Sequence, residues 1–524
     1  MKTNKSIFKN FFIISLSLFI AYVFTGCGDY DAANLHDLPV IRIDTLNAAS
    51  IADRETWVPM TFSLTDPANP SNDIPAIEDQ QIRGRGNASW TLTPPDGKKP
   101  YRIRFRNDQK QSPFGLPPAR NWVLLKGGAE LNTSFGFELG KRLGLKYTCS
   151  YNHVHLYLNG NYRGLYFFTE HRQADPEKIG APGRPKVDLT EGWFVEIDRY
   201  FDEAPKFRTA NYNLPIMVKT PEDSNVDPNE WSFDISEFPV FDIVVNDLNN
   251  ITNLMASDSF PENGYRDLVD IVSFVKYFIV QTLVKNNDLF RPGVETGYEI
   301  GSTYFYKDKG GKISAGPIWD LDWSFSPWEF EGEKFLPDTV PYQIHPWFKR
   351  FHDDPVFHVR YKEIWNNNYS DNILTMSNFV DELGKKIRKG AMQDQKRWSE
   401  GSIDWHIGHI KRYFFTRVSY LHNEYNKVDV LPVSGEFDLG TAKTFTLAAF
   451  GDITNMTASL QKGSDSPFEI VTGLTKTQTS AGGYLAEITV RQKTSGADKL
   501  ILKGRNQEKD FTINVELTEA VPKL

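Results

Sequence analysis

Hydrophobic and polar positions in the first half of the chain follow the pattern of short strands separated by turns. His153–Leu158 and Tyr162–Phe168 are two such runs, and they flank Asn159-Gly160. Asn and Gly tolerate positive φ, so this pair favours a two-residue β-hairpin turn. Similar apolar runs recur before and after this hairpin. Strands are therefore expected to dominate the first half.

Helical spacing of apolar residues marks other segments. In the first half, Phe135, Leu139 and Leu143 recur every four residues. In the second half, an apolar stripe over 268–283 predicts a long helix, and residues 355–426 predict further amphipathic helices. The chain is thus expected to pass from a sheet-rich half to a helical half.

From about residue 431 the pattern changes to a period of two. Ala486, Ile488 and Val490 alternate with polar residues, and the stretch 511–517 does the same. Such runs, separated by clusters of Gly, Ser and Asp, are typical of a small β-sandwich. Residues 431–524 are therefore predicted to form an Ig-like accessory domain.

The N-terminus has the pattern of a targeting segment. Three lysines precede the apolar stretch Phe11–Phe24, and small residues lead into Cys27. This pattern predicts a signal peptide over residues 1–26. The small residues before Cys27 resemble a bacterial lipobox, which would place a lipid on Cys27; an ordinary signal peptide with an incidental cysteine is the alternative.

Residues 27–37 are then expected to act as a tether. Gly28–Asp31 resembles the acidic export tag of Bacteroidota surface lipoproteins. We therefore expect a protein of the cell envelope that is anchored in the outer membrane by lipidated Cys27 and exposed at the surface.

Charge content argues against a nucleic-acid partner, and cysteine content argues against an internal disulfide. With a net charge of −8, the chain lacks the excess of basic residues that nucleic-acid-binding proteins carry. If Cys27 carries a lipid, Cys149 is the remaining cysteine and no internal disulfide forms. Cys149 is expected to be a small buried apolar residue. Aromatic residues make up 14% of the chain, which favours a well-filled core.

Candidate metal ligands lie in the segment Gly316–Phe325. It carries Asp320 and Asp322, flanked by tryptophans. If the segment is extended, residues two apart point to the same side, and both carboxylates face one ion. Mg²⁺ prefers such oxygen ligands. The alternative is that the two carboxylates accept hydrogen bonds from turn amides.

Asp288 is the candidate catalytic base. It follows Asn286-Asn287 at the exit of the apolar helix, and a hairpin of Thr303–Tyr306 and Lys312–Ile318 then leads to Asp320. Phosphoryl-transfer enzymes of the protein-kinase type use this order of parts. Taken alone, Asn-Asn-Asp is also a common way to end a helix.

A phosphate clamp requires cations. Lys99 precedes an alternating run after Pro100, which suits a strand. Arg83 and Arg85 alternate with glycines that let backbone amides approach an anion. Most lysines are solvated surface charges, so these residues are candidates for phosphate binding only in the context of the other motifs.

Several motifs in this order resemble the CotH kinase family (spore-coat protein H-like). The resemblance covers roughly residues 38–425. It rests on these segments: Arg83–Trp90, Lys98–Ile103, Asn121–Leu125, Phe137–Gly144, Leu156–Tyr166, Glu196–Asp198, Val218–Glu222, Asn286–Asp288 and Trp319–Asp322.

The resemblance implies an α+β fold: a two-lobed, atypical protein kinase-like domain over residues 38–430, followed by the C-terminal β-sandwich. It implies transfer of a phosphoryl group from ATP, with Mg²⁺ or Mn²⁺, to Ser or Thr of an unidentified protein acceptor. By resemblance, Asp288 is the base and Asp320 with Asp322 is the metal pair. Lys99 would hold ATP phosphates, with Glu138 as its helix partner.

Two departures from the family pattern keep other functions open. Asn132-Thr133 stands where many members have Arg-Asn, and Ser302-Thr303 stands where many carry an Asn. The alternative is an inactive kinase-like module for surface attachment or glycan handling, with carboxylates holding a structural Ca²⁺. A glycosidase is a third hypothesis, although Asp320 and Asp322 are too close in sequence to flank a sugar.

Overall fold

The computed structural model describes residues 38–521 apart from 117, 128–129, 172–188, 190, 228–229, 231, 288, 292–298, 326–345 and 400. The candidate base Asp288 and the candidate lipidation site Cys27, with the predicted signal peptide and tether, lie outside the described residues. Within the described ranges, no helix has the length and apolar character needed to cross a membrane.

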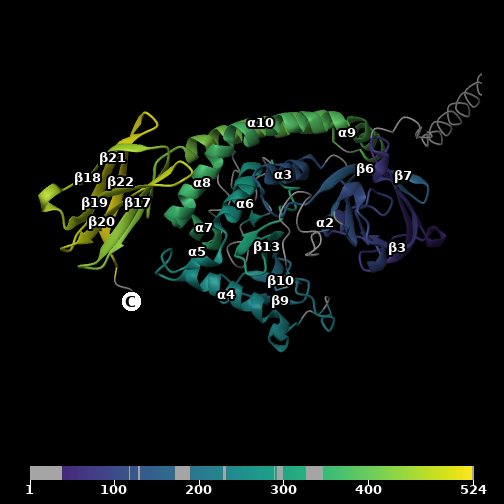
Figure 1. Ribbon diagram of the computed structural model, residues 1–524, viewed down its shortest axis with the longest axis horizontal. Coiled ribbons are helices and arrows are strands. Elements are labelled where there is room, and N and C mark those ends of the chain that lie inside the picture. The colour runs from purple at the N-terminus through teal and green to yellow at the C-terminus, as the bar shows by residue number, and fades with distance from the viewer. Residues whose placement is uncertain are drawn as a thin grey trace, which may run out of the picture.

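The described part of the first half forms a closed barrel in the order β1-β2-β3-β4-β5-β7-β6 (Figure 1). Parallel pairing of β1 with β6 closes it, whereas the other pairs are antiparallel. Every second residue of β2 is buried, so one face of the strand fills the barrel. The strands are β1 (Val40–Thr45), β2 (Val58–Thr65), β3 (Ile74–Gly84), β4 (Tyr101–Arg104), β5 (Asn121–Leu125), β6 (Tyr151–Leu158) and β7 (Asn161–Glu170).

Three local predictions in this half are confirmed. β6 and β7 form the expected hairpin, with Asn159 and Gly160 at φ +50° and +70°. The predicted helix is α3 (Leu131–Arg142), which runs between β5 and β6, and the short α2 (Ala88–Thr91) lies between β3 and β4. Cys149 is buried, as expected.

The second part combines a sheet of order β14-β13-β8-β10-β9 with helices. Its centre is α6, whose first turn is capped by Asp270 accepting a hydrogen bond from Ser273 N at 3.1 Å. The strands are β8 (Trp193–Ile197), β9 (Lys206–Arg208), β10 (Pro215–Thr220), β13 (Thr303–Lys307) and β14 (Ile313–Ala315), with a small separate pair of β11 (Phe290–Arg291) and β12 (Glu299–Ile300). The helices are α4 (Asp242–Ala256), α5 (Tyr265–Leu268), α6 (Ile271–Val284), α7 (Pro346–Asp353), α8 (Pro355–Asn368), α9 (Met376–Trp398) and α10 (Ile403–Tyr425).

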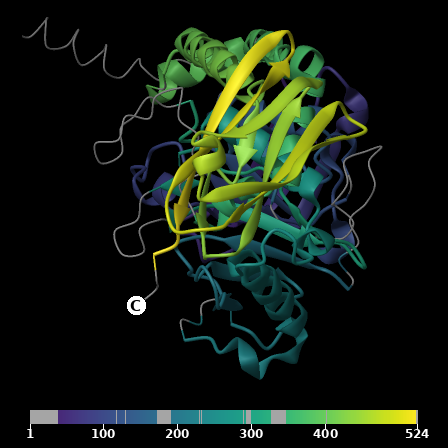
Figure 2. The ribbon, with the colours of Figure 1, turned by 90° about the vertical axis from the view of Figure 1, so that its left-hand side faces the viewer.

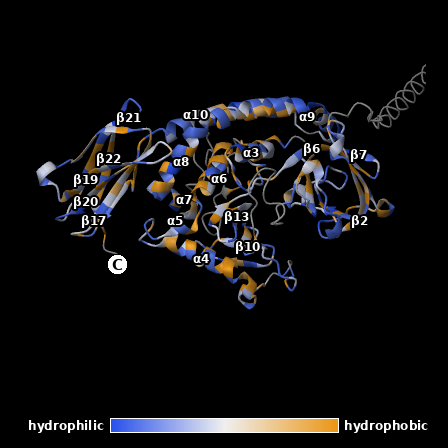
Figure 3. Cartoon of the chain, viewed as in Figure 1, coloured by the Kyte–Doolittle hydropathy of each residue, from blue (hydrophilic) through white to orange (hydrophobic). Residues whose placement is uncertain are grey.

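The C-terminal segment forms two four-stranded sheets, of order β15-β17-β20-β19 and β16-β22-β21-β18. Hydrophobic and hydrophilic residues alternate along their strands (Figure 3), and buried residues of both sheets form one apolar cluster. Figure 2 views the molecule from the side of these sheets. Their strands are β15 (Asp429–Leu431), β16 (Ser434–Phe437), β17 (Ala442–Phe450), β18 (Ile453–Leu460), β19 (Phe468–Gln478), β20 (Gly483–Gln492), β21 (Asp498–Asn506) and β22 (Lys509–Glu519).

Candidate functional site

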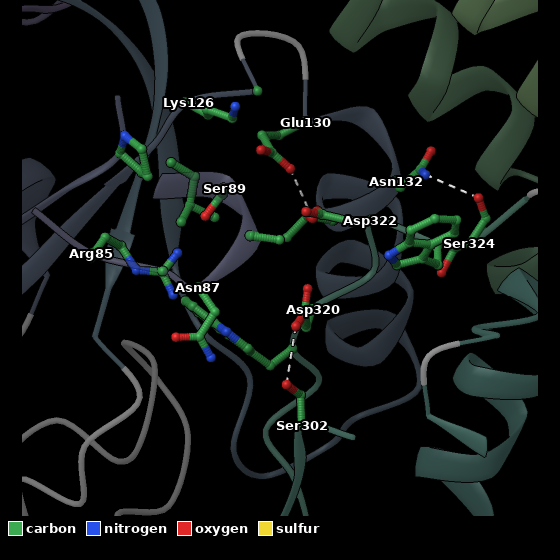
Figure 4. A pocket seen from close by; sticks show the side chains of 18 of the residues that line it. Arg85, Asn87, Ser89, Lys126, Glu130, Asn132, Ser302, Asp320, Asp322 and Ser324 are labelled. Atoms are coloured by element: carbon green, nitrogen blue, oxygen red, sulfur yellow. Dashed lines mark hydrogen bonds between the residues drawn. The ribbon is translucent and has the colours of Figure 1, made fainter. Parts of the chain in front are cut away.

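A large cavity of about 1260 Å³ lies where the barrel, α3 and the start of α10 meet the segment that follows β14. Asp320 and Asp322 line it from that segment. Arg83 and Arg85 line it from the end of β3 and the loop beyond. Figure 4 shows Arg85, Asn87, Ser89 and Lys126 on one side and the two aspartates on the other. The cavity therefore has a cationic wall that faces a carboxylate wall.

A turn, rather than an extended strand, brings the two aspartates together. Asp320 has φ +55°, in the left-handed region, and a turn begins at Asp322. The prediction of an extended Asp-Leu-Asp segment is wrong. Both side chains line the same cavity because the chain bends between them, while Leu321 points away into the core and is fully buried.

Ser302 connects Asp320 to a third carboxyl group. Its hydroxyl donates to Asp320 Oδ2 at 3.0 Å, and its backbone N–H donates to Asp198 Oδ2 at 2.7 Å. Burial, reinforced by the nearby charge of Glu196, raises the pKa of Asp198 to about 6. Ser302, one of the departures from the family pattern, thus positions a candidate metal ligand.

Helix α3 and the residues just after α6 hold the backbone around the aspartates. Asn132 Nδ2 donates to Leu321 O at 3.3 Å and to Ser324 O at 3.1 Å, and Asn286 Nδ2 donates to Asp320 O at 3.2 Å. The second departure from the family pattern, at Asn132, therefore also contacts the segment that carries the carboxylates. Both amides fix its position through backbone carbonyls.

Lys126 and Glu130 are among the cavity-lining residues that sequence reasoning missed. Lys126 directly follows β5, and its ammonium donates to Thr93 Oγ1 at 2.5 Å. Burial, followed by repulsion from Asp322, raises the pKa of the Glu130 carboxyl to about 8. Thr133 Oγ1 donates to Glu130 Oε2 at 3.1 Å. In the sequence, Lys126 could have been recognised as a candidate by its position immediately after a buried strand.

The predicted cations differ in their positions. Arg83 lies 4.7 Å above the Trp57 ring, and burial lowers its guanidinium pKa. Arg83 and Arg85 both line the cavity, and their contact with an anion stays a prediction. Lys99 is absent from the described residues that line the cavity, because its ammonium donates to Trp90 O at 2.9 Å and to Thr93 O.

The predicted pairing of Lys99 with Glu138 does not occur. Glu138 pairs with Arg142 of the next helical turn at 2.7 Å. The buried lysine of this region is instead Lys98, which forms an ion pair with Asp394 of α9. Neither Lys99 nor Glu138 therefore occupies the role that the resemblance implied.

The residues present fit a hard divalent cation that is shared with a ligand. No group of three or more His, Cys, Asp or Glu residues in the described ranges has the geometry to hold a metal alone. Mg²⁺, however, is commonly bound by one or two carboxylates together with substrate phosphates and water. Asp320 and Asp322 supply such oxygens on the cavity, and beside them lies the carboxyl of Glu130, whose pKa is raised by burial and then by the charge of Asp322.

The fold and the site define an α+β protein with a carboxylate-bearing pocket between a barrel and a helix-rich part. The family model described as CotH kinase protein matches residues 82–422, well over half of the chain. The chain therefore belongs to the CotH kinase family.

A comparison with curated proteins gave no match. Among solved structures, "Solution Structure of Amebosin" is 14% identical over 17% of this chain and 88% of that chain, with a TM-score of 0.11. A likeness this low supports no conclusion about fold or function.

Proposed function

We propose that this protein is a kinase that transfers the γ-phosphoryl group of ATP to Ser or Thr hydroxyls of proteins in the cell envelope. The observation that supports this most directly is the pair Asp320 and Asp322 facing a cavity whose opposite wall carries Arg85 and Lys126 and whose lining also includes Arg83. Carboxylates that hold Mg²⁺ and cations that contact phosphates are the two parts that phosphoryl transfer requires.

The protein groups divide the work between them. Asp320 and Asp322 would hold Mg²⁺ or Mn²⁺, which would supply charge neutralisation on the phosphates. Arg83, Arg85 and Lys126 would orient the triphosphate for in-line transfer. Asp288, by family resemblance, would accept the proton of the acceptor hydroxyl.

The wider arrangement is part of the same proposal. The barrel and the helix-rich part would act as the two lobes of a kinase-like domain, and the two C-terminal sheets as a sandwich-type accessory domain. A lipid on Cys27 would hold the molecule at the outer membrane, where its acceptor proteins are exposed.

The second candidate is a kinase-like binding module without catalysis. The two departures from the family pattern support it, because Ser302 and Asn132 are committed to hydrogen bonds within the protein. At these two positions a metal or phosphate ligand would then be missing. In this alternative the carboxylates hold a structural cation, and ATP does not bind.

Thermal unfolding of the purified full chain with ATP and Mg²⁺ or Mn²⁺ separates the two candidates. A ligand that binds the native state stabilises it by about 2.7 kcal/mol at one hundred times its Kd. We expect a metal-dependent shift that is lost in Asp320→Asn and Asp322→Asn and retained in Asp465→Asn, a control in the exposed turn between β18 and β19. The absence of any shift at millimolar ATP would reject the kinase and favour the binding module.

A further inference from the structure

Two tryptophans at the rim of the cavity are exposed, although most large apolar side chains are buried. Trp323 is 45% exposed and Trp405 is 58% exposed, and both line the cavity. Exposed indoles beside a site are costly in water and are enriched among the residues that dominate protein interfaces. They therefore mark a surface that a ligand covers.

Trp405 is held in place before any ligand arrives. Its ring stacks on His409 at 4.9 Å with an angle of 5° between the planes. Nε2 of His409 is hydrogen-bonded to Phe325 O at 2.6 Å, which ties α10 to the segment after Asp322. One indole face is thus covered by imidazole. A ligand that stacks on the open face loses little side-chain entropy from the protein.

The rim lies at the end of the cavity where the carboxylates are. Trp323 directly follows Asp322. Trp405 is linked through His409 to Phe325, which lies three residues after Asp322. In ATP the ribose and two phosphates separate the base from the γ-phosphoryl group. A platform beside the metal ligands therefore lies on the side of the phosphoryl acceptor, and the base lies farther away.

Several polar side chains near this rim already have partners within the protein. Asn132 donates to two backbone carbonyls, Asp404 pairs with Arg388 through both oxygens, and the Nε2 of His409 is bonded to Phe325 O. A sugar needs several hydrogen bonds to its hydroxyls in addition to stacking. The rim is therefore better suited to an apolar or aromatic side chain.

From these observations we infer that Trp323 and Trp405 form the docking platform for a polypeptide acceptor. The acceptor places an apolar or aromatic side chain against Trp405, a few residues from the Ser or Thr that is phosphorylated. This inference rests on the proposed kinase function and specifies its substrate class. In the transfer, the bond between the γ-phosphorus and the ADP oxygen breaks, the hydroxyl oxygen bonds to that phosphorus, and its proton passes to a carboxylate.

A positional peptide library tests the inference with the purified full chain, ATP and Mg²⁺. Each peptide carries one Ser, and each flanking position holds Ala, Leu or Phe in turn. We expect kcat/KM to rise about tenfold for Leu or Phe at one flanking position, a change of about 1.4 kcal/mol. Trp405→Ala should abolish this preference, and Trp405→Phe should restore most of it.

The control is Phe415→Ala, which removes another exposed aromatic of α10, outside the cavity. It should keep the preference. The ATP- and metal-dependent thermal shift, measured in the same samples, should be unchanged in Trp405→Ala. A uniform kcat/KM across the library, equal behaviour of the Trp405→Ala and Phe415→Ala variants, or phosphorylation of glycans in place of peptides would overturn the inference while leaving ATP binding intact. Loss of the thermal shift in the unmodified chain would instead overturn the proposed function itself.

Discussion

At the scale of single residues, Asp320 meets two requirements at once. Its backbone adopts φ +55°, and its carboxylate both faces the cavity and accepts a hydrogen bond from Ser302. Asp and Asn adopt the left-handed region more readily than other residues with a Cβ. The position therefore selects for an Asp through backbone conformation as well as through charge.

Replacing Asp320 by Asn or by Ala should separate these two requirements. Both changes remove the negative charge, so both should abolish metal-dependent ATP binding. Of the two, Ala alone is also destabilised by steric strain in the left-handed conformation, by about 1–2 kcal/mol. We expect Asp320→Ala to have a free energy of unfolding lower than that of Asp320→Asn by about this amount, measured by urea denaturation without ligand. Equal stabilities of the two variants would show that the turn relaxes without strain.

The residues of the site could be predicted from the sequence only in part. One cavity is lined by Asp320, Asp322, Arg83 and Arg85. These residues could be predicted because their motifs follow one another along the chain in a kinase-like order. Lys99 is absent from the described lining because its ammonium donates to the backbone carbonyls of Trp90 and Thr93, and the sequence carries no local signal for such partners.

At the scale of elements, α3 determines where the carboxylates lie. Leu321, between the two aspartates, packs directly on Gly136 of this helix. A Cβ added at Gly136 would lie 2.1 Å from Leu321 Cδ1. Leu321 is fully buried, so it has no space into which to retreat. The glycine is needed for close approach of the two segments.

We expect Gly136→Ala to lower the free energy of unfolding by about 1–2 kcal/mol, because overpacking of a core costs about 1–3 kcal/mol and exceeds the helix-propensity gain of Ala. It should also weaken the ATP- and metal-dependent thermal shift by displacing the aspartates. Gly408→Ala in α10 is the matched control, since its new Cβ meets only the end of the Arg412 side chain at 3.2 Å. A Gly136→Ala variant as stable as this control would contradict the packing argument.

Local elements could be predicted where periodicity and turn chemistry act over a few residues. The β6–β7 hairpin, α3 and α6 follow from such signals. Closure of the barrel could not be predicted, because it depends on parallel pairing of β1 with β6, for example Val40 beside His155. Residues so far apart in sequence leave no local pattern, and only the assembled core selects their register.

At the scale of the whole molecule, α8 joins the kinase-family region to the C-terminal sheets. Lys362 is fully buried on α8 and forms an ion pair with Asp429 of β15 at 2.6 Å, while His358 Nε2 is 2.8 Å from the same carboxylate. Farther along, buried Glu363 accepts from Gly483 N at 3.1 Å. Charged groups on one helix therefore hold the first strand of the two sheets and the start of β20.

This arrangement makes the attachment sensitive to acid. Hydrogen bonding from His358 and the charge of Lys362 outweigh burial and lower the pKa of Asp429 from 3.8 to about 2. A carboxyl whose folded pKa is depressed contributes stability that is fully present above its unfolded pKa and is lost as the pH falls through the folded value. The contribution of Asp429 should therefore disappear between about pH 4 and pH 2.

Comparing the full chain with Asp429→Asn by urea unfolding at a series of pH values measures this contribution directly. The unmodified chain should be the more stable from pH 5 to 7, and the difference should shrink toward zero by about pH 2. The side chain of Asp429 is 35% exposed, so high salt should reduce the difference by screening. Asn367→Ala removes a different contact between α8 and the sheets, the hydrogen bond to Ala481 O at 3.0 Å, without removing a titratable group. The stability lost in that control should not vary with pH, and a difference for Asp429→Asn that is equally constant would show that the carboxylate is not what holds the sheets to α8.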